Sequence, residues 1–286
     1  MLGSQVMLTV PDGVTAVGTD LREAPGVEAV GVDLADGAAV ARAFEEFGPF
    51  TGVIHTAAYT AVDKAEEEPE LAMRVNGLAC GVLARACAAA NDGAGIPLVV
   101  VSTDFVFDGR SKEPYSEEDR PNPLSVYGKT KLEGERLAVA AHPSGTRIVR
   151  TQWLYGPRGK HFPGTMLALA AQRDEISVVD DQHGAPTSTL ELAPALWDVL
   201  RTGQAGIYHA ACEGEATWFD FAVEVFENRV RDDVRVLPCT TEQFPRPARR
   251  PAFSVLDCSK LAELRGKPLA DWRAALATFL GSSDES

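Results

Sequence analysis

Basic residues are scarce in this sequence. Its 286 residues contain 27 Lys and Arg against 41 Asp and Glu, which gives a net charge of −14 at pH 7 and a pI near 4.8. Proteins that bind nucleic acids or anionic membranes present clusters of positive charge. The charge balance therefore argues against nucleic acid and membrane as partners, and it predicts that any anionic ligand is held locally by a few residues.

Cysteine and histidine are equally sparse. The five cysteines are odd in number, widely scattered and without a C-x-x-C pair, so neither a disulfide framework nor a zinc site is predicted. The five histidines form no metal-binding motif, and we expect His161 and His183 to be structural rather than metal ligands. Free thiols of this kind are typical of a reducing cytoplasm.

Long apolar runs are missing as well. No stretch of 18 consecutive apolar residues occurs, and the N-terminus has neither the basic segment nor the apolar core of a signal peptide. The hydrophobic content of 45% is nevertheless ordinary for a globular protein with a sizeable core. We therefore predict a cytoplasmic location.

What the sequence does contain is an alternation of strand and helix patterns. Short apolar segments suited to buried parallel strands alternate with segments of helical periodicity. This alternation predicts an α/β fold with a doubly wound, Rossmann-type parallel sheet and with ligands at the carboxyl ends of its strands. The expected strands cover residues 14–19, 27–32, 52–58, 97–103, 147–151 and 206–211, and the main expected helices cover 38–47, 71–90, 189–201, 217–228 and 271–280.

One Tyr-x-x-x-Lys motif indicates a catalytic role. Tyr127 and Lys131 lie one turn apart at the start of a further predicted helix, so their side chains share a face. A free tyrosine has a pKa of about 10, and a nearby cation favours the phenolate and lowers that pKa. Tyr127 is thus a candidate general acid or base. The same spacing also arises by chance on surface helices, so it needs support from other residues.

That support comes from Thr103, which ends the most strand-like segment, and from longer strings along the chain. With Thr103 followed by Tyr127 and Lys131, the chain resembles the extended short-chain dehydrogenase/reductases, and within them the family of dTDP-4-dehydrorhamnose reductase and dTDP-dihydrostreptose synthase. The matching strings are T-A-A-Y-T-A-V-D-K-A-E at 56–66, S-T-D-F-V-F-D-G at 102–109, N-P-L-S-V-Y-G-K-T-K at 122–131, R-T-Q-W-L-Y-G at 150–156, V-D-D-Q-H-G-A-P-T at 179–187 and R-R-P-A-F-S at 249–254.

The resemblance implies a reductase whose substrate is a dTDP-4-keto-6-deoxy-L-sugar and whose cofactor is NADPH or NADH. Hydride would reduce the C4 keto group, and Tyr127 would give the proton to the developing alkoxide. Thr103 would be a second donor to that oxygen, because donors aimed at developing charge stabilise it. Lys131 would hold the nicotinamide ribose and lower the pKa of Tyr127. The resemblance also allows a homodimer.

The resemblance places the cofactor at the carboxyl ends of the early strands. Asp33 and Leu34 would flank the adenine, while Ala57, Ala58 and Thr60 would lie along the ribose and nicotinamide. Small residues there let a ligand approach the backbone. The alternative for Asp33 is a purely structural role as a turn or cap residue.

The choice between the two cofactors stays open. Asp20 ends the first expected strand and suits a ribose 2′-hydroxyl, which favours NADH. Arg22 stands two residues away and suits a 2′-phosphate, which favours NADPH. Asp20, like Asp33, also fits an ordinary turn.

A sugar-nucleotide pocket is implied by the second half of the resemblance. Asp104, Phe105 and Trp153 would lie nearest the hexose, and Arg249 and Arg250 would meet the pyrophosphate or sit in a solvated turn. Most relatives carry Tyr where this chain has Phe105. Sugar-nucleotide dehydratases carry Glu at that position as an acid/base group, so its absence argues against dehydration.

The N-terminal segment departs from the family pattern. A dinucleotide fold opens with a strand and a G-x-x-G-x-x-G loop, whereas Leu2 and Gly3 already match the end of that loop. The missing strand would be central, so its loss would split the sheet and leave backbone groups unpaired. We expect the full fold to start roughly ten residues upstream. If the chain begins at Met1, we expect weakened cofactor affinity and poor solubility.

The expected organisation is a dinucleotide-binding domain over residues 1–155, truncated at its start, and a mainly substrate-binding part over 156–286. Segments near 185–235 are expected to return to the sheet domain. A second hypothesis from another class is a non-catalytic, nucleotide-binding regulatory subunit of the same fold. Thr103, Tyr127 and Lys131 favour the enzyme, and the incomplete glycine loop favours the regulatory subunit.

Overall fold

The computed structural model describes residues 1–229 and 234–282. Its centre is a four-stranded parallel sheet in the order β10-β5-β4-β3. Every residue of β4 is buried, as its run of apolar residues predicts for a strand covered on both faces. These strands are β3 (Val53–His55), β4 (Leu98–Thr103), β5 (Thr146–Thr151) and β10 (Gly206–His209).

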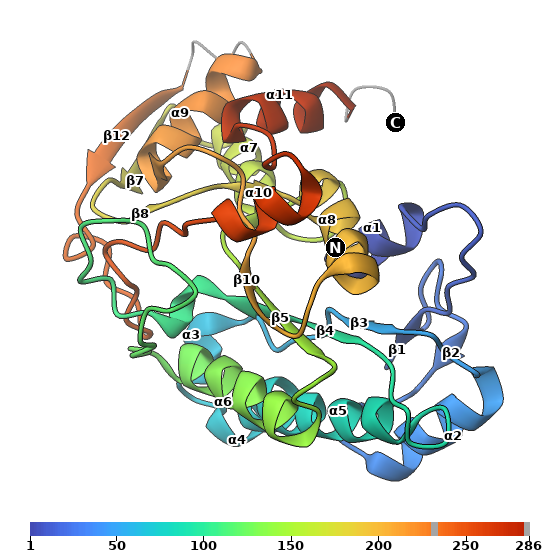
Figure 1. The fold of residues 1–286 in the computed structure, drawn as a ribbon. Coiled ribbons are helices and arrows are strands. Elements are labelled where there is room, and N and C mark those ends of the chain that lie inside the picture. The colour runs from blue at the N-terminus through green and yellow to red at the C-terminus, as the bar shows by residue number, and fades with distance from the viewer. Residues whose placement is uncertain (230–233, 283–286) are drawn as a thin grey trace.

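Helices cover both faces of this sheet (Figure 1), so the predicted α/β fold of the Rossmann type is confirmed. One layer holds α5 packed against α6, with α2 beside α5, and the opposite layer holds α1 packed against α8. The bounds of the first layer are α2 (Gly37–Phe47), α4 (Pro69–Met73), the π-helix η1 (Arg74–Leu78), α5 (Ala79–Ala89) and α6 (Val126–Ala141), with α3 (Val62–Ala65) beside them; those of the second are α1 (Leu2–Leu8) and α8 (Thr189–Thr202).

The sheet is divided at its β3 end. The strands β1 (Thr19–Asp20) and β2 (Ala29–Val30) pair with each other in parallel and form a separate two-stranded sheet. The expected strand at 14–19 is therefore wrong over most of its length. Within residues 1–229 and 234–282 no strand joins the two sheets. The expectation of a preceding strand and glycine loop stays a prediction.

The rest of the chain forms a second body of helices and short strand pairs above the sheet (Figure 1). Its pairs are β7 with β12, β6 with β9 and β8 with β11. The bounds are β6 (Leu154–Tyr155), α7 (Phe162–Ala170), β7 (Glu175–Val179), β8 (His183–Gly184), β9 (Thr187–Ser188), β11 (Ala216–Thr217), α9 (Trp218–Asn228), β12 (Arg235–Cys239), α10 (Ser259–Arg265) and α11 (Trp272–Ser282).

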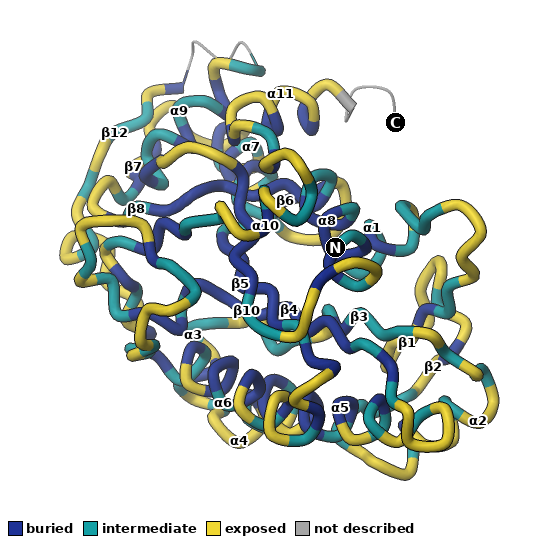
Figure 2. The backbone as a smooth tube through the Cα atoms, viewed as in Figure 1, coloured by how far each residue is buried: buried dark blue, intermediate teal, exposed yellow. Residues whose placement is uncertain are grey.

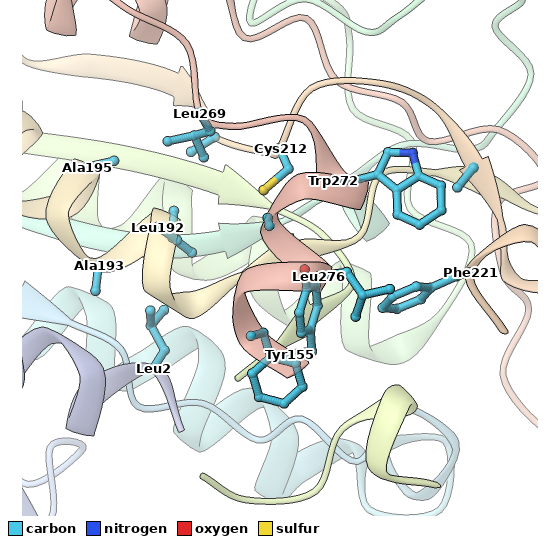
Figure 3. Close-up of a cluster of buried hydrophobic side chains, with 14 of the residues drawn as sticks. Leu2, Tyr155, Leu192, Ala193, Ala195, Cys212, Phe221, Leu269, Trp272 and Leu276 are labelled. Carbon is cyan, nitrogen blue, oxygen red and sulfur yellow. The ribbon is translucent and has the colours of Figure 1, made fainter. Parts of the chain in front are cut away.

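The largest hydrophobic core joins the two bodies. Figure 3 shows Leu2 of α1, Leu192 and Ala193 of α8, and Trp272 and Leu276 of α11 within one buried cluster. Figure 2 shows buried residues along the strands of the sheet and along parts of α8, whereas the exposed residues lie at the periphery. Strand β10 and helix α8 come from the second half of the chain but pair with and cover the sheet. The division at residue 155 stays a proposal.

One helical run, Pro69–Ala89, is long and apolar enough to cross a membrane by length and composition alone. Half of its most apolar window is buried inside the fold, where α5 packs against α6, as in the core helix of a soluble protein. This run is therefore weak evidence for a membrane span. All five cysteines are free.

Candidate active site

The predicted catalytic residues meet where β4 ends and α6 begins. Thr103 is the last residue of β4, and the chain then turns through the 3₁₀-helix η2 (Asp104–Val106). Ser125 caps α6 by accepting a hydrogen bond from the Gly128 N–H, which fixes Tyr127 in the first turn. A Cβ at Gly128 would lie 2.2 Å from the Phe105 carbonyl oxygen, so this glycine permits the close approach of η2 to α6.

Tyr127 lies in an apolar setting against Phe105, whose ring stands edge-on at a centroid distance of 5.6 Å. Burial raises the pKa of Tyr127 to about 12, whereas a hydrogen bond with Thr103 lowers it. The expectation of a lowered pKa is thus wrong for this structure, because desolvation outweighs the hydrogen bond. Tyr127 is held as a neutral phenol, which is the form that a proton donor requires.

Lys131 is buried and does not act on Tyr127 here. Its Nζ donates to the Val101 carbonyl oxygen at 2.7 Å, and burial lowers the pKa of its ammonium. The cation is absent from the groups that shift the pKa of Tyr127. The predicted electrostatic role of Lys131 is therefore not seen, because β4 itself holds the ammonium.

A buried ion pair supports this helix face from behind. The Arg150 guanidinium of β5 donates to both carboxylate oxygens of Glu135, at 3.0 and 2.7 Å, and Ser102 donates to the same carboxylate at 2.5 Å. Arg150 and Glu135 are both almost fully buried. The pair ties α6 to the two strands that carry the site, and Glu135, after Cys80, opposes the fall in the pKa of Lys131 that burial causes.

The loop after β3 is held by a residue that the sequence reading missed. Asn76, in the π-helix η1, accepts from the Tyr59 N–H at 2.8 Å and donates to the Tyr59 carbonyl at 3.1 Å. It also donates to the Thr130 hydroxyl of α6 at 3.1 Å. A π-turn often marks a functional site. The feature of the sequence that could have indicated this role is a single amide side chain within an otherwise apolar helical run, V-N-G-L.

We expect Asn76→Ala to lower the free energy of unfolding by about 1–3 kcal/mol, because the Tyr59 backbone groups lose their partner. Urea denaturation measures this change. Asn228→Ala is the matched control, since among the described residues the Asn228 amide donates to Glu224, one turn earlier in α9, and we expect a change of about 0.5 kcal/mol or less. Equal effects of the two variants would contradict the role given to Asn76.

Comparison with known proteins decides the family. Residues 4–284 match the model of the RmlD substrate binding domain. The chain belongs to this family. It is 46% identical over 246 residues to the dTDP-4-dehydrorhamnose reductase of Streptomyces griseus, which covers 84% of this chain and 79% of that protein.

Solved structures agree with this assignment. The crystal structure of a dTDP-4-dehydrorhamnose reductase from Clostridium acetobutylicum is 41% identical, with a TM-score of 0.89 over 99% of this chain and 96% of that one. The enzyme of the same name from Bacillus anthracis, solved in complex with NADP, is 36% identical, with a TM-score of 0.81 over 88% of this chain and 87% of that one. The family resemblance read from the motifs is confirmed.

Two residues expected at the substrate of this RmlD-type protein are engaged elsewhere. Asp104 is almost fully buried, and its two carboxylate oxygens accept from Thr103 and Ser254, so a direct contact with sugar is not supported. Arg250 forms a two-pronged ion pair with Asp63, with both N–O distances at 3.0 Å. Its guanidinium is therefore committed to α3, whereas Arg249 is exposed and stays a prediction.

Trp153 takes a backbone conformation that non-glycine residues rarely adopt, with φ of 47°. Its indole stacks on Trp218 at a centroid distance of 3.7 Å. A Cβ at Gly184 would come within 2.7 Å of the same indole, so the ring is confined from that side too. Trp153 is thereby held rigidly, and its contact with a hexose stays a prediction, as does that of Phe105.

Most of the predicted cofactor residues lie in or after strands β1, β2 and β3, and Leu2 and Gly3 lie in α1. The Leu2 side chain is buried in the core, so only its backbone could meet a ligand, and its role stays a prediction. Asp33 caps its own turn and pairs with Arg74, which together hold the pKa of its carboxyl low. Gly3, Asp20, Leu34, Ala57, Ala58 and Thr60 are half-buried or exposed and stay predictions.

Proposed function

We propose that this protein reduces the C4 keto group of a dTDP-4-keto-6-deoxy-L-sugar with NADPH or NADH, as a step of deoxysugar biosynthesis. The observation that carries the proposal is the arrangement at the carboxyl end of β4, where the buried Thr103 hydroxyl acts on the pKa of the neighbouring, neutral Tyr127 phenol. The names of its RmlD-family relatives support the same reaction.

The residues near β3 fit a nicotinamide cofactor. Ala57 and Ala58 offer only small side chains there, and a Cβ at Gly3 would come within 2.9 Å of the Thr56 hydroxyl oxygen. The bound cofactor supplies hydride to the sugar. Asp33 and Leu34 would hold its adenine, and Lys131 would hold the nicotinamide ribose after leaving the Val101 carbonyl.

In the proposed reaction Tyr127 provides the proton for the alkoxide that hydride transfer creates. A phenol whose pKa is about 12 is fully protonated at neutral pH, so the donor is present when substrate binds. Thr103 orients the phenol through their shared hydrogen bond. The Phe105 ring packs edge-on against Tyr127 and limits the positions that the phenol can take.

The direct test supplies the chain with NADPH or NADH and a dTDP-4-keto-6-deoxy-L-sugar and follows loss of absorbance of the reduced cofactor. The expected result is turnover, with the 4-hydroxy sugar nucleotide as product. Nucleotide binding without turnover, under conditions where the protein is folded, would favour the non-catalytic regulatory subunit instead.

Variants at the end of β1 test which of the two cofactors the protein prefers. Arg22 and Asp20 are both exposed there, and the Arg22 N–H donates to the Asp20 carboxylate. We expect Arg22→Ala to raise KM for NADPH about tenfold, since a charged hydrogen bond contributes about 1.5–3 kcal/mol, and to leave KM for NADH unchanged. Asp20→Ala should weaken NADH instead. Equal KM changes for both cofactors in both variants would place these residues away from the ribose.

We propose further that the protein works in the cytoplasm, which its five free cysteines support. A homodimer rests on the resemblance alone, and sedimentation equilibrium would measure the mass in solution. The division into a dinucleotide-binding part over 1–155 and a mainly substrate-binding part over 156–286 is supported by the placement of the β4 and α6 residues in the first part.

A further inference from the structure

The buried carboxyl of Asp104 stands beside the catalytic hydroxyl, and the proposed reaction does not use it. Asp104 is 1% exposed. Its Oδ1 accepts from the Thr103 hydroxyl at 2.9 Å, and its Oδ2 accepts from the Ser254 hydroxyl at 2.6 Å. Ser254 comes from a segment 150 residues further along the chain, so the contact joins the sheet body to the second body.

The Thr103 hydroxyl has one proton and two lone pairs. One lone pair accepts from the Phe105 N–H at 3.2 Å. While Asp104 is ionised it can only accept, so the single proton of Thr103 goes to Oδ1 and the second lone pair is left without a proton to donate. Thr103 is then an acceptor toward the reacting centre.

Protonation of Asp104 reverses this arrangement. A proton on Oδ1 would be donated to the second lone pair of Thr103, which then has both lone pairs occupied and its own proton free. The Thr103 hydroxyl would then point away from Asp104 and could donate to the oxygen that receives charge. Ser254 keeps a partner in either state, because the His183 carbonyl lies 3.3 Å from its hydroxyl.

We propose that Asp104, held by Ser254, is a positioning residue whose protonation state decides whether the Thr103 proton is held by the Asp104 carboxylate or is free for donation to the sugar C4 oxygen. This inference rests on the reduction proposed above. Ionised Asp104 withdraws one of the two donors from the developing alkoxide, and protonated Asp104 restores it. The reduction is therefore expected to proceed faster with Asp104 protonated.

The surroundings of Asp104 suit a switch near neutral pH. Burial raises the pKa of Asp104 to about 6, and the hydrogen bonds from Ser254 and Thr103 oppose that rise. Tyr127 on α6 acts electrostatically with Asp104 and stays neutral. His183 on β8 presents only its backbone carbonyl to Ser254, and its ring is directed to Glu215 at 2.7 Å. In the described part of the chain no charged side chain contributes to this pKa.

The test is the pH profile of kcat for reduction, measured with the wild type and two variants. For the wild type we expect kcat to fall by roughly tenfold per pH unit above the pKa of Asp104, until the slower reaction of the ionised form dominates. We call this alkaline fall in kcat the limb of the profile. Asp104→Asn should remove the limb. Ser254→Ala should move the limb to higher pH, because the lost hydrogen bond had stabilised the ionised form. Asp119→Asn, an exposed aspartate on the same connection, is the control and should keep the wild-type profile.

Difference infrared spectroscopy of the same proteins follows the carbonyl stretch of the protonated carboxyl without any turnover. A band that titrates in the wild type, is absent from Asp104→Asn and titrates at higher pH in Ser254→Ala supports the proposal. A limb that survives in Asp104→Asn, or that moves to lower pH or stays fixed in Ser254→Ala, overturns it. If Asp104→Asn does not fold, Ser254→Ala decides alone. Absence of wild-type turnover at every pH, with the infrared titration intact, would instead refute the proposed function.

Discussion

Tyr127→Phe is expected to lower kcat of the proposed reduction by roughly 10²- to 10⁴-fold, the usual contribution of a positioned general acid. The variant removes the phenol that gives the proton in the proposed reaction, while the ring keeps its edge contact with Phe105. KM for the sugar nucleotide should change little, because the phenol proton matters in the transition state rather than in binding. Steady-state kinetics measure both quantities.

Tyr208→Phe is the matched control for this loss. Tyr208 is a buried tyrosine on β10, and its hydroxyl donates to the Gln204 carbonyl at 3.0 Å. We expect it to keep kcat within about threefold of the wild type. If Tyr127→Phe retained a comparable rate, another group would have to supply the proton, and the assignment of Tyr127 would be wrong.

Glu135→Ala is expected to destabilise the protein by about 3–5 kcal/mol, because it leaves the Arg150 guanidinium buried without its counter-charge. Both residues are buried, and the carboxylate also accepts from Ser102. The loss should appear as a lower midpoint in urea denaturation with an unchanged slope. The free energy of unfolding is the quantity to compare.

Two further variants separate the ion pair from a general effect on α6. Glu133→Ala removes an exposed carboxylate from the same helix and should cost about 0.5 kcal/mol or less. Glu135→Leu combined with Arg150→Met removes both charges and should recover most of the stability. A loss below about 1 kcal/mol in Glu135→Ala would show that the buried pair does not hold α6 to the strands.

The sequence predicted those parts of the site that depend on local order along the chain. The apolar run 98–101 before Ser102 and Thr103, and the helical pattern that begins near Tyr127, predicted β4 and α6, and these elements bring Thr103 and Tyr127 together. Strand alternation likewise predicted the parallel sheet. These features follow from periodicity, which acts over short stretches of the chain.

What the sequence did not predict depends on partners far apart in the chain. Ser254 meets Asp104 across 150 residues, and Arg250 meets Asp63 across 187. Two-residue strands such as β6 and β8 are too short for any period to be visible. Nor can spacing reveal that Lys131 donates to a strand carbonyl, because that choice depends on how closely α6 packs against β4.

The most direct test of the account follows a label from cofactor to sugar. Reduced cofactor carrying deuterium at C4 of the nicotinamide is given to the chain with a dTDP-4-keto-6-deoxy-L-sugar, and the product is examined by NMR and mass spectrometry. We expect one deuterium at C4 of the sugar for each cofactor oxidised, and labelling that is roughly 10²- to 10⁴-fold slower with Tyr127→Phe. Cofactor oxidation without deuterium at the sugar C4, or equal labelling by Tyr127→Phe, would contradict it.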